Sequence, residues 1–264
     1  SSSNSSSSGT NEPTWRERES AMWCIWCVSR VFVEQQRHWS DLLKMSTASQ
    51  TGAVEPPTAE ETEHCRKSSS ILTQLLIGIA SNPQAFSHPL LVRTVAATIG
   101  ALSSWIDTVA EMHPQIVQAS ATYLVTSLRI KGASDEASKG LQRVLNKCGR
   151  WMSNPTMVAQ LIHEVNSASN QLSPESRQNL IDGIATVIVK MKTNDEARGG
   201  LEALVGPVLE RLENALHAAQ QGMQQQQQGM QQQTNDVLET ALKSISDELK
   251  TFATAMNHVD YFKQ

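Results

Sequence analysis

The chain has 264 residues, of which 39% are hydrophobic and 18% charged, which is enough for one large domain or two ordinary ones. Its 22 Lys and Arg against 26 Asp and Glu give a net charge of −4 without a basic block, which argues against nucleic-acid binding through phosphate neutralisation. No run of 18 apolar residues occurs, which excludes a membrane-spanning helix. Four Cys are too few for a disulfide framework and fit a reducing compartment.

The first residues, 1–13, are predicted to form a disordered, Ser-rich segment. Seven of the first nine residues are Ser, and no initiating Met is present. A secretory signal peptide would need an apolar centre, which this segment lacks. We therefore expect the chain to be an interior piece of a longer protein.

Apolar residues recur at steps of three and four along most of the chain, as in the stripe Leu91, Val95 and Ile99. This spacing places one apolar face on an amphipathic helix, and alternating strand patterns are nearly absent. The pattern predicts nine helices, near 14–35, 66–81, 88–110, 114–130, 135–152, 156–169, 174–191, 195–219 and 235–257.

Three helix starts carry capping signals. Asn154 and Ser173 each precede a Pro, which is the order of an N-cap followed by Pro at the first helical position. Thr193 and Glu196 have the spacing of a capping box. These residues predict helices that begin near 155, 174 and 194.

Two polar, low-complexity segments interrupt the helical pattern. Residues 36–65 are predicted to be a disordered insertion, and residues 220–234 a disordered, Gln-rich loop. The helical array then comprises residues 14–219, and residues 235–264 hold the first helix of a further repeat. That helix presents an apolar stripe without a second helix to cover it.

The helix pairs start near 88, 135 and 174, at a step of roughly 40 residues that is typical of HEAT or armadillo arrays. Each pair has too small a core to stand alone, so neighbouring pairs must stack. The sequence therefore predicts an all-α, HEAT-type α-solenoid, a right-handed superhelix of antiparallel helix pairs with two low-complexity insertions.

Cys24 and Cys27 have the C-x-x-C spacing of a thiol redox site or half a zinc site. Further zinc ligands could come from His38, His64 and Cys65, at irregular spacing. Because no βαβ context accompanies the motif, we favour two small apolar residues on a helix over a thiol or zinc site. No residue is assigned a catalytic, cofactor-binding or metal-ligating role.

Trp residues are the other candidates for a functional role. Trp105 and Trp151 lie on apolar stripes, so core packing is favoured over a partner-binding anchor. Trp23 points away from the side shared by Trp15 and Trp26 on the first helix. Contact of Trp23 with a neighbouring repeat and a place in an exposed patch both stay open.

One ordered set of motifs resembles a known family. Residues 93–106 read Arg-Thr-Val-Ala-Ala-Thr-Ile-Gly-Ala-Leu-Ser-Ser-Trp-Ile, and His113-Pro114 and Tyr123-Leu124 follow. This order resembles the central HEAT repeats of karyopherin-β nuclear transport receptors of the transportin-SR and importin-thirteen class. Residues 175–189, with Glu, Arg, Leu, Gly and Val at matching positions, resemble the repeat that follows.

The opening segment Trp15-Arg-Glu-Arg-Glu-Ser-Ala-Met resembles a helix start of the same family, so that the resemblance spans roughly residues 14–216. Two positions depart from the family pattern. Ser127 stands where the family usually has Gly, and Gly140 stands where it usually has Ala. The second change costs about 1 kcal/mol of helix propensity.

The resemblance implies a nuclear import receptor, not an enzyme, that uses no cofactor and shuttles between cytoplasm and nucleus. Such receptors bind protein cargo on the concave face, contact nucleoporins, and release cargo when Ran-GTP binds, here mostly outside this chain. The second helices of the pairs, 114–130, 156–169 and 195–219, are where cargo contacts are expected. A HEAT-repeat scaffold without a transport role is the alternative, since solenoids are widely reused.

Overall fold

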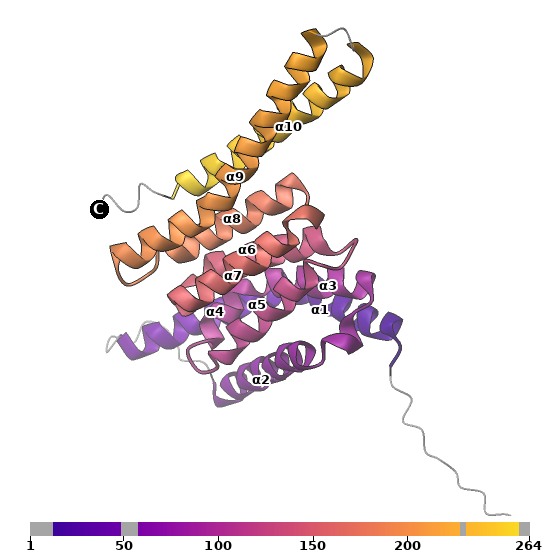
Figure 1. The fold of residues 1–264 in the computed structure, drawn as a ribbon. Coiled ribbons are helices and arrows are strands. Elements are labelled where there is room, and N and C mark those ends of the chain that lie inside the picture. The colour runs from indigo at the N-terminus through magenta and orange to yellow at the C-terminus, as the bar shows by residue number, and fades with distance from the viewer. Residues whose placement is uncertain (1–12, 49–57, 228–230, 259–264) are drawn as a thin grey trace, which may run out of the picture.

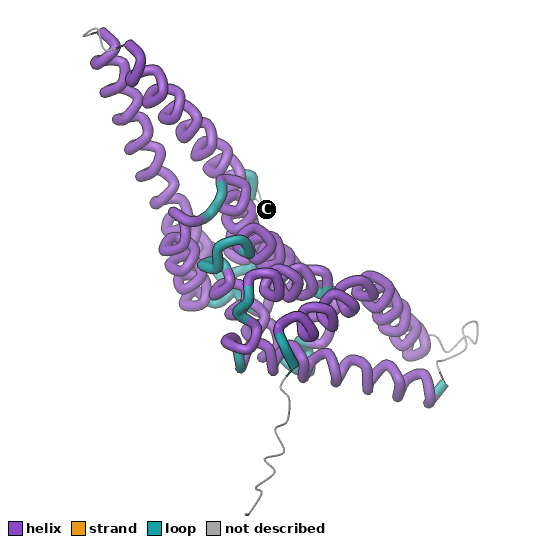
Figure 2. Tube along the Cα trace, turned by 90° about the vertical axis from the view of Figure 1, so that its right-hand side faces the viewer, coloured by secondary structure: helices purple, strands orange, loops and turns teal. Residues whose placement is uncertain are grey.

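The computed structural model describes residues 13–48, 58–227 and 231–258. Within these ranges the chain consists of helices and short connections, without a strand (Figures 1 and 2), so the predicted all-α class is confirmed. The helices are α1 (Trp15–Ala48), α2 (Ala59–Ser81), α3 (Pro89–Ala101), α4 (Ser103–Val109), α5 (Gln115–Ser127), α6 (Ser134–Cys148), α7 (Pro155–Ala168), α8 (Pro174–Ile188), α9 (Asn194–Gln227) and α10 (Gln231–Met256), with 3-10 turns η1 (Pro83–Phe86), η2 (Gly149–Trp151) and η3 (Ser169–Gln171).

The helices pack in two rows. In the first row α1 contacts α3, α3 contacts α6, α6 contacts α8, and α8 contacts α10. In the second row α2 contacts α5, α5 contacts α7, and α7 contacts α9. Contacts of α5 with α6, and of α8 with α7 and α9, join the rows into the stack visible in Figure 1.

Gly100, Gly140 and Gly183 allow the first-row helices to approach closely. A Cβ on Gly140 of α6 would lie only 2.7 Å from the carbonyl oxygen of Ala96 on α3. A Cβ on Gly183 of α8 would lie 3.1 Å from the Cα of Gln142 on α6. Because these distances are below ordinary van der Waals contact, the backbones of α3, α6 and α8 touch one another. Close packing therefore explains why Gly stands at position 140, where helix propensity alone would disfavour it.

The core runs along the stack between the two rows. Trp105 is buried and meets Phe32 of α1 edge-on, with 5.8 Å between the ring centroids. Other fully buried side chains come from successive helices, among them Leu91, Leu124 and Leu141. One hydrophobic cluster thus joins α1 to α10, as expected of neighbours that bury one another's apolar faces.

The expected helix 88–110 is two helices. α3 and α4 meet at Leu102 with a bend of 61°, and Leu102 has φ −84° and ψ 1° in place of helical angles. Gly100 and Ser103 beside it are weak helix formers, which accounts for a break at this point. Among the described helices none is individually long and apolar enough to cross a membrane, and the bent α3–α4 pair alone has that length and composition.

Parts of the two segments predicted to be disordered are helical, while residues 49–57 and 228–230 lie outside the described residues. Residues 36–48 continue α1 and residues 59–65 begin α2. Residues 220–227 likewise continue α9, and 231–234 begin α10. Gln, Glu, Met and Ala are good helix formers, and extending an existing helix costs far less than nucleating one. Of the N-terminal segment 1–13, all but the last residue lies outside the described residues.

The capping signals are confirmed. The Asn154 side chain accepts a hydrogen bond from the Thr156 N–H at 2.9 Å. Ser173 Oγ accepts one from the Ser176 N–H at 3.2 Å. The Glu196 N–H donates to Thr193 Oγ1, also at 3.2 Å. Each bond satisfies a backbone donor that the helix start leaves without a partner.

Candidate protein-binding surfaces

A groove of about 330 Å³ lies between α5 and α7, two neighbouring helices of the second row. Its floor is apolar, with Leu161 buried and Val125 and Met157 half-buried. Its rim is polar and carries Gln118 and Gln160, among others. An apolar centre inside a polar rim is the usual anatomy of a protein-binding patch.

An ion pair spans one end of this α5–α7 groove. Arg129 Nη2 lies 2.7 Å from Glu164 Oε2, and the same nitrogen donates to Ser167 Oγ at 2.9 Å. Both charged side chains remain partly exposed, so the pair contributes little to stability.

The sequence placed candidate partner contacts on the second helices of the pairs, without naming residues. Two of those ranges, 114–130 and 156–169, contain the helices that enclose the α5–α7 groove. The third, 195–219, falls in α9, which contacts α7. The groove itself could not be foreseen, because its depth depends on how closely α5 and α7 approach.

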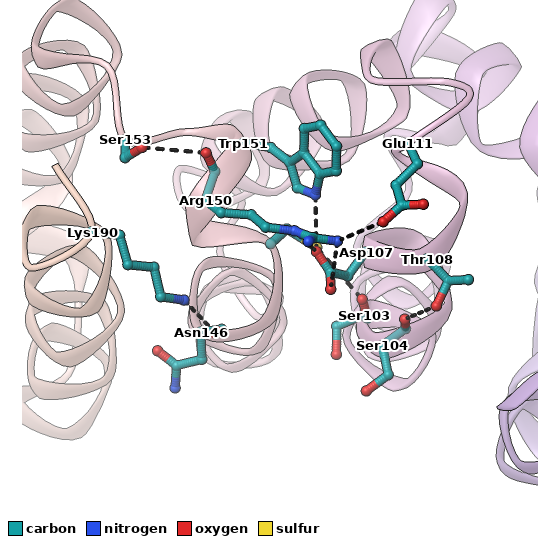
Figure 3. A network of polar contacts seen from close by, with 11 residues as sticks. Ser103, Ser104, Asp107, Thr108, Glu111, Asn146, Arg150, Trp151, Ser153 and Lys190 are labelled. Carbon is teal, nitrogen blue, oxygen red and sulfur yellow. Dashed lines mark hydrogen bonds and ion pairs between the residues drawn. The ribbon is translucent and has the colours of Figure 1, made fainter. Parts of the chain in front are cut away.

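A polar network joins α4 to the turn η2 (Figure 3). Asp107 Oδ1 accepts hydrogen bonds from Trp151 Nε1 at 2.9 Å and from Arg150 Nε at 3.2 Å. Arg150 also reaches Glu111 at 3.4 Å and lies over the Trp151 ring, 4.8 Å from its centroid. Asp107 therefore holds the turn η2, which follows α6, against α4. The role of this network is structural.

The next step of the stack shows two related contacts. Lys190 Nζ donates to the Asn146 carbonyl oxygen at 3.1 Å, as drawn in Figure 3, and burial lowers the pKa of Lys190. Asp182 of α8 accepts from Gln142 Nε2 at 2.8 Å and from Asn146 Nδ2 at 3.4 Å. Polar side chains thus join α6 to α8.

Asp182 also contacts a residue that follows α10. His258 Nε2, just after α10, lies 3.0 Å from Asp182 Oδ1. Burial raises the pKa of Asp182, but the hydrogen bonds from Gln142, His258 and Asn146 outweigh it, and the net pKa lies below its usual value. The carboxylate is therefore held ionised as the anchor for the end of α10.

The C-x-x-C motif lies on α1, where Cys24 and Cys27 are both exposed and free. Within the described residues no group of three His, Cys, Asp or Glu side chains could hold a metal ion. The side chains of His38, His64 and Cys65, named above as further ligands, lie outside the described part of the chain. Cys148 is buried, which raises the pKa of its thiol to about 12.

The tryptophans divide between core and surface. Trp105 is buried as predicted, and Trp151 is half-buried with its N–H bonded to Asp107. Trp23 is 51% exposed and lies against Trp26, with 4.7 Å between ring centroids. The sequence left open whether Trp23 contacts a neighbouring repeat or belongs to an exposed patch, and within this structure it belongs to an exposed patch. Trp15 stacks on His88, with 3.6 Å between the ring centroids. Trp15, Trp23 and Trp26 together line a wide groove between α1 and α3.

No protein-family model, curated protein sequence or solved structure matches the chain.

Proposed function

We propose that the chain is a segment of a nuclear transport receptor of the karyopherin-β kind, built as a HEAT-type right-handed solenoid, that binds protein cargo on its second-row helices. The α5–α7 groove is the observation that carries the assignment of the cargo surface. It lies on the helices that the resemblance assigns to the concave face, and its floor of Leu161, Val125 and Met157 is apolar.

The helix arrangement supports the solenoid part of the proposal. Gly100, Gly140 and Gly183 recur at roughly the repeat length of HEAT arrays. Each sits where one first-row helix meets the next, and the row continues through α10. Regular stacking of this kind produces an extended surface on which a protein partner can lie across several repeats.

In this proposal Ran-GTP and cargo bind the same receptor with unfavourable coupling. Ran-GTP engages repeats mostly outside this chain, and its binding weakens the hold of the second-row helices on cargo. Coupling between two sites is reciprocal, so cargo weakens Ran-GTP binding by the same factor. Nucleoporin contacts let the receptor shuttle between cytoplasm and nucleus.

The test uses the full-length protein immobilised on a matrix and loaded with cell extract. Wild type is compared with Val125→Glu/Met157→Glu, which places charge on the groove floor, and with the control Val28→Glu, an exposed first-row position outside the α5–α7 groove. We expect the double variant to retain far less of the partners that Ran-GTP elutes, and the control to match wild type. Equal retention by all three proteins would remove the groove from the cargo surface.

A partner set that Ran-GTP does not change would contradict transport altogether. The chain would then be a HEAT-repeat scaffold, and binding at the groove would still separate the floor variant from its control. The two outcomes are therefore distinguishable within one experiment.

A further inference from the structure

Helices α9 and α10 form an antiparallel hairpin that projects beyond the stacked body of the molecule (Figures 1 and 2). α9 has 34 residues, a length of about 51 Å. The two helices are held in register near the body by Arg211 and Glu248, whose Nε and Oε2 atoms lie 3.1 Å apart. Farther out, Gly222 lies against Leu238.

Each helix of the hairpin exposes a large apolar side chain every seventh residue. On α9 these side chains are Leu209 (47% exposed), Leu216 (46%) and Met223 (47%). On α10 they are Leu242 (55%), Leu249 (50%) and Met256 (39%). Seven residues are nearly two helical turns, so each set lines one face of its helix.

The two sets lie on the same side of the hairpin. Leu216 follows Ala215, which is buried between the helices, and Leu249 follows the buried Glu248 in the same way. One residue turns the side chain by about 100° about the axis. Because the helices run in opposite directions, the same turn on both moves Leu216 and Leu249 to one common side.

Half-buried residues complete this surface. Leu212 on α9, and Ile245 and Phe252 on α10, fall between the exposed residues and give a spacing of three and four from Leu209 to Leu216 and from Leu242 to Met256. That spacing is the seam of a coiled coil, in which side chains of one helix insert between those of another. We name the six exposed residues together with these three the heptad ridge.

The heptad ridge stands out among the described residues. Of the fourteen large hydrophobic side chains that are exposed there, six belong to it. An apolar surface of this continuity on a projecting element marks an interaction site more often than a solvated face. Two antiparallel helices that present apolar residues on one common side can pack one further helix against that side.

The charges beside the ridge indicate which helix fits. Glu213 is exposed beside Leu209 and Leu216, while Lys243 and Lys250 lie on the opposite side of α10 by the same rotation. A second copy of the chain would bring the same Glu213 beside its own ridge, and two like charges do not complement each other. A helix with basic residues flanking its apolar seam pairs with Glu213 instead.

We propose that the heptad ridge is a docking site for one amphipathic helix that carries apolar residues at alternating spacings of three and four and Lys or Arg beside them. The proposal does not depend on the transport function, because it uses the spacing and exposure of residues on α9 and α10 alone.

The test measures binding of a fluorescent 21-residue helical peptide with Leu at the seam positions and Lys beside them, by anisotropy. We expect saturable binding to wild type, at least a tenfold weaker affinity for Leu216→Asp/Leu249→Asp, and unchanged binding to the control Ile71→Asp, an exposed residue of α2. In Glu213→Lys, preference should shift to a peptide with Glu in place of Lys.

Absence of binding to wild type, or equal binding to the ridge variant, would overturn the proposal. Sedimentation equilibrium tests the other occupant. A wild-type dimer that Leu216→Asp/Leu249→Asp makes monomeric would assign the ridge to a second copy of the chain, and would equally overturn the proposal.

Discussion

Gly100 of α3 and Gly140 of α6 lie face to face, so close that a Cβ on Gly100 would be 3.0 Å from the Cα of Gly140. The two helices can approach this far because neither presents a side chain at their contact. The packing of one helix pair on the next therefore depends on a residue type that weakens an isolated helix.

Replacement of Gly140 by Ala should destabilise the protein. The new methyl group would lie 2.7 Å from the Ala96 carbonyl oxygen, and backbone cannot move aside as a side chain does. Overpacking costs about 1–3 kcal/mol, against about 1 kcal/mol gained in helix propensity. We expect a net loss of about 1 kcal/mol in the free energy of unfolding, measured with urea.

The matched control for this change is Gly199→Ala in α9, where a Cβ meets no atom within 4 Å. That variant should gain up to about 1 kcal/mol from helix propensity alone. A Gly140→Ala protein as stable as Gly199→Ala would show that close approach of α3 and α6 is not needed.

Trp151→Phe should lower stability through one lost hydrogen bond. The substitution keeps an aromatic ring but removes the N–H that donates to Asp107 at 2.9 Å. Bonds to a charged group contribute about 1.5–3 kcal/mol, and partial exposure of Asp107 reduces this to about 1 kcal/mol. Trp23→Phe, on the surface, should change stability by less than about 0.5 kcal/mol.

A double-mutant cycle separates this bond from general packing. If the bond carries the effect, Trp151→Phe should cost much less in an Asp107→Ala background, which has no acceptor, than in wild type. Equal costs in both backgrounds would assign the loss to the size of the ring.

Glu248→Gln should loosen the α9–α10 hairpin. The Glu248 side chain is 3% exposed and meets Arg177 at 3.3 Å and Arg211 at 3.1 Å, which tie α10 to α8 and α9. Removing one member of a buried ion pair costs about 3–5 kcal/mol, and less here because both arginines reach solvent. We expect a loss of about 2 kcal/mol.

Hydrogen exchange locates that loss. Amides of α10 should exchange faster in Glu248→Gln, while those of α3 stay protected. The exposed Glu239→Gln serves as control. Unchanged protection of α10 would mean that the ion pairs do not hold the hairpin.

The Asp182 contacts make stability depend on pH. Because the folded-state pKa of Asp182 lies below its usual value, the ionised group stabilises the protein above the unfolded-state value of about 3.9. That stabilisation is lost as the pH falls through the lower, folded-state pKa. Asp182→Asn should therefore cost about 1 kcal/mol at pH 7 and less at pH 3.

Urea unfolding at the two pH values checks this, with Asp236→Asn on the exposed surface of α10 as control. A cost of Asp182→Asn that is the same at pH 7 and pH 3 would contradict a role for the carboxylate charge.

Helix positions followed from local pattern more readily than contacts did. The stripe that includes Leu91, Val95 and Ile99 and the caps at Asn154 and Ser173 are local signals, and the structure places helices there. The break at Leu102 was missed because Leu102 and Ile106 keep the apolar spacing across it. Local periodicity does not record a bend that the packing of α3 and α4 imposes.

The low-complexity segments were misread for a related reason. The Gln-rich stretch has too few apolar residues to bury by itself, yet it extends α9, whose earlier part already packs against α8 and α7. Ending the helix at residue 219 also left Met223 out of the seven-residue series with Leu209 and Leu216. The heptad ridge was therefore visible in the sequence only once α9 was known to continue.

The contacts of Asp107 carry little sequence signal. Asp107 and Arg150 belong to different helix pairs, and nothing local indicates that they meet. The α5–α7 groove is similar, because it depends on the distance between two helices and not on either one alone.

The most direct test of the transport proposal is the dissociation of a bound cargo protein from the immobilised full-length receptor, followed by biolayer interferometry. Ran locked in its GTP form should accelerate dissociation, while Ran-GDP at the same concentration should leave it unchanged. Identical dissociation with Ran-GTP, Ran-GDP and buffer, with no Ran bound to the receptor, would contradict the proposal and favour a HEAT-repeat scaffold.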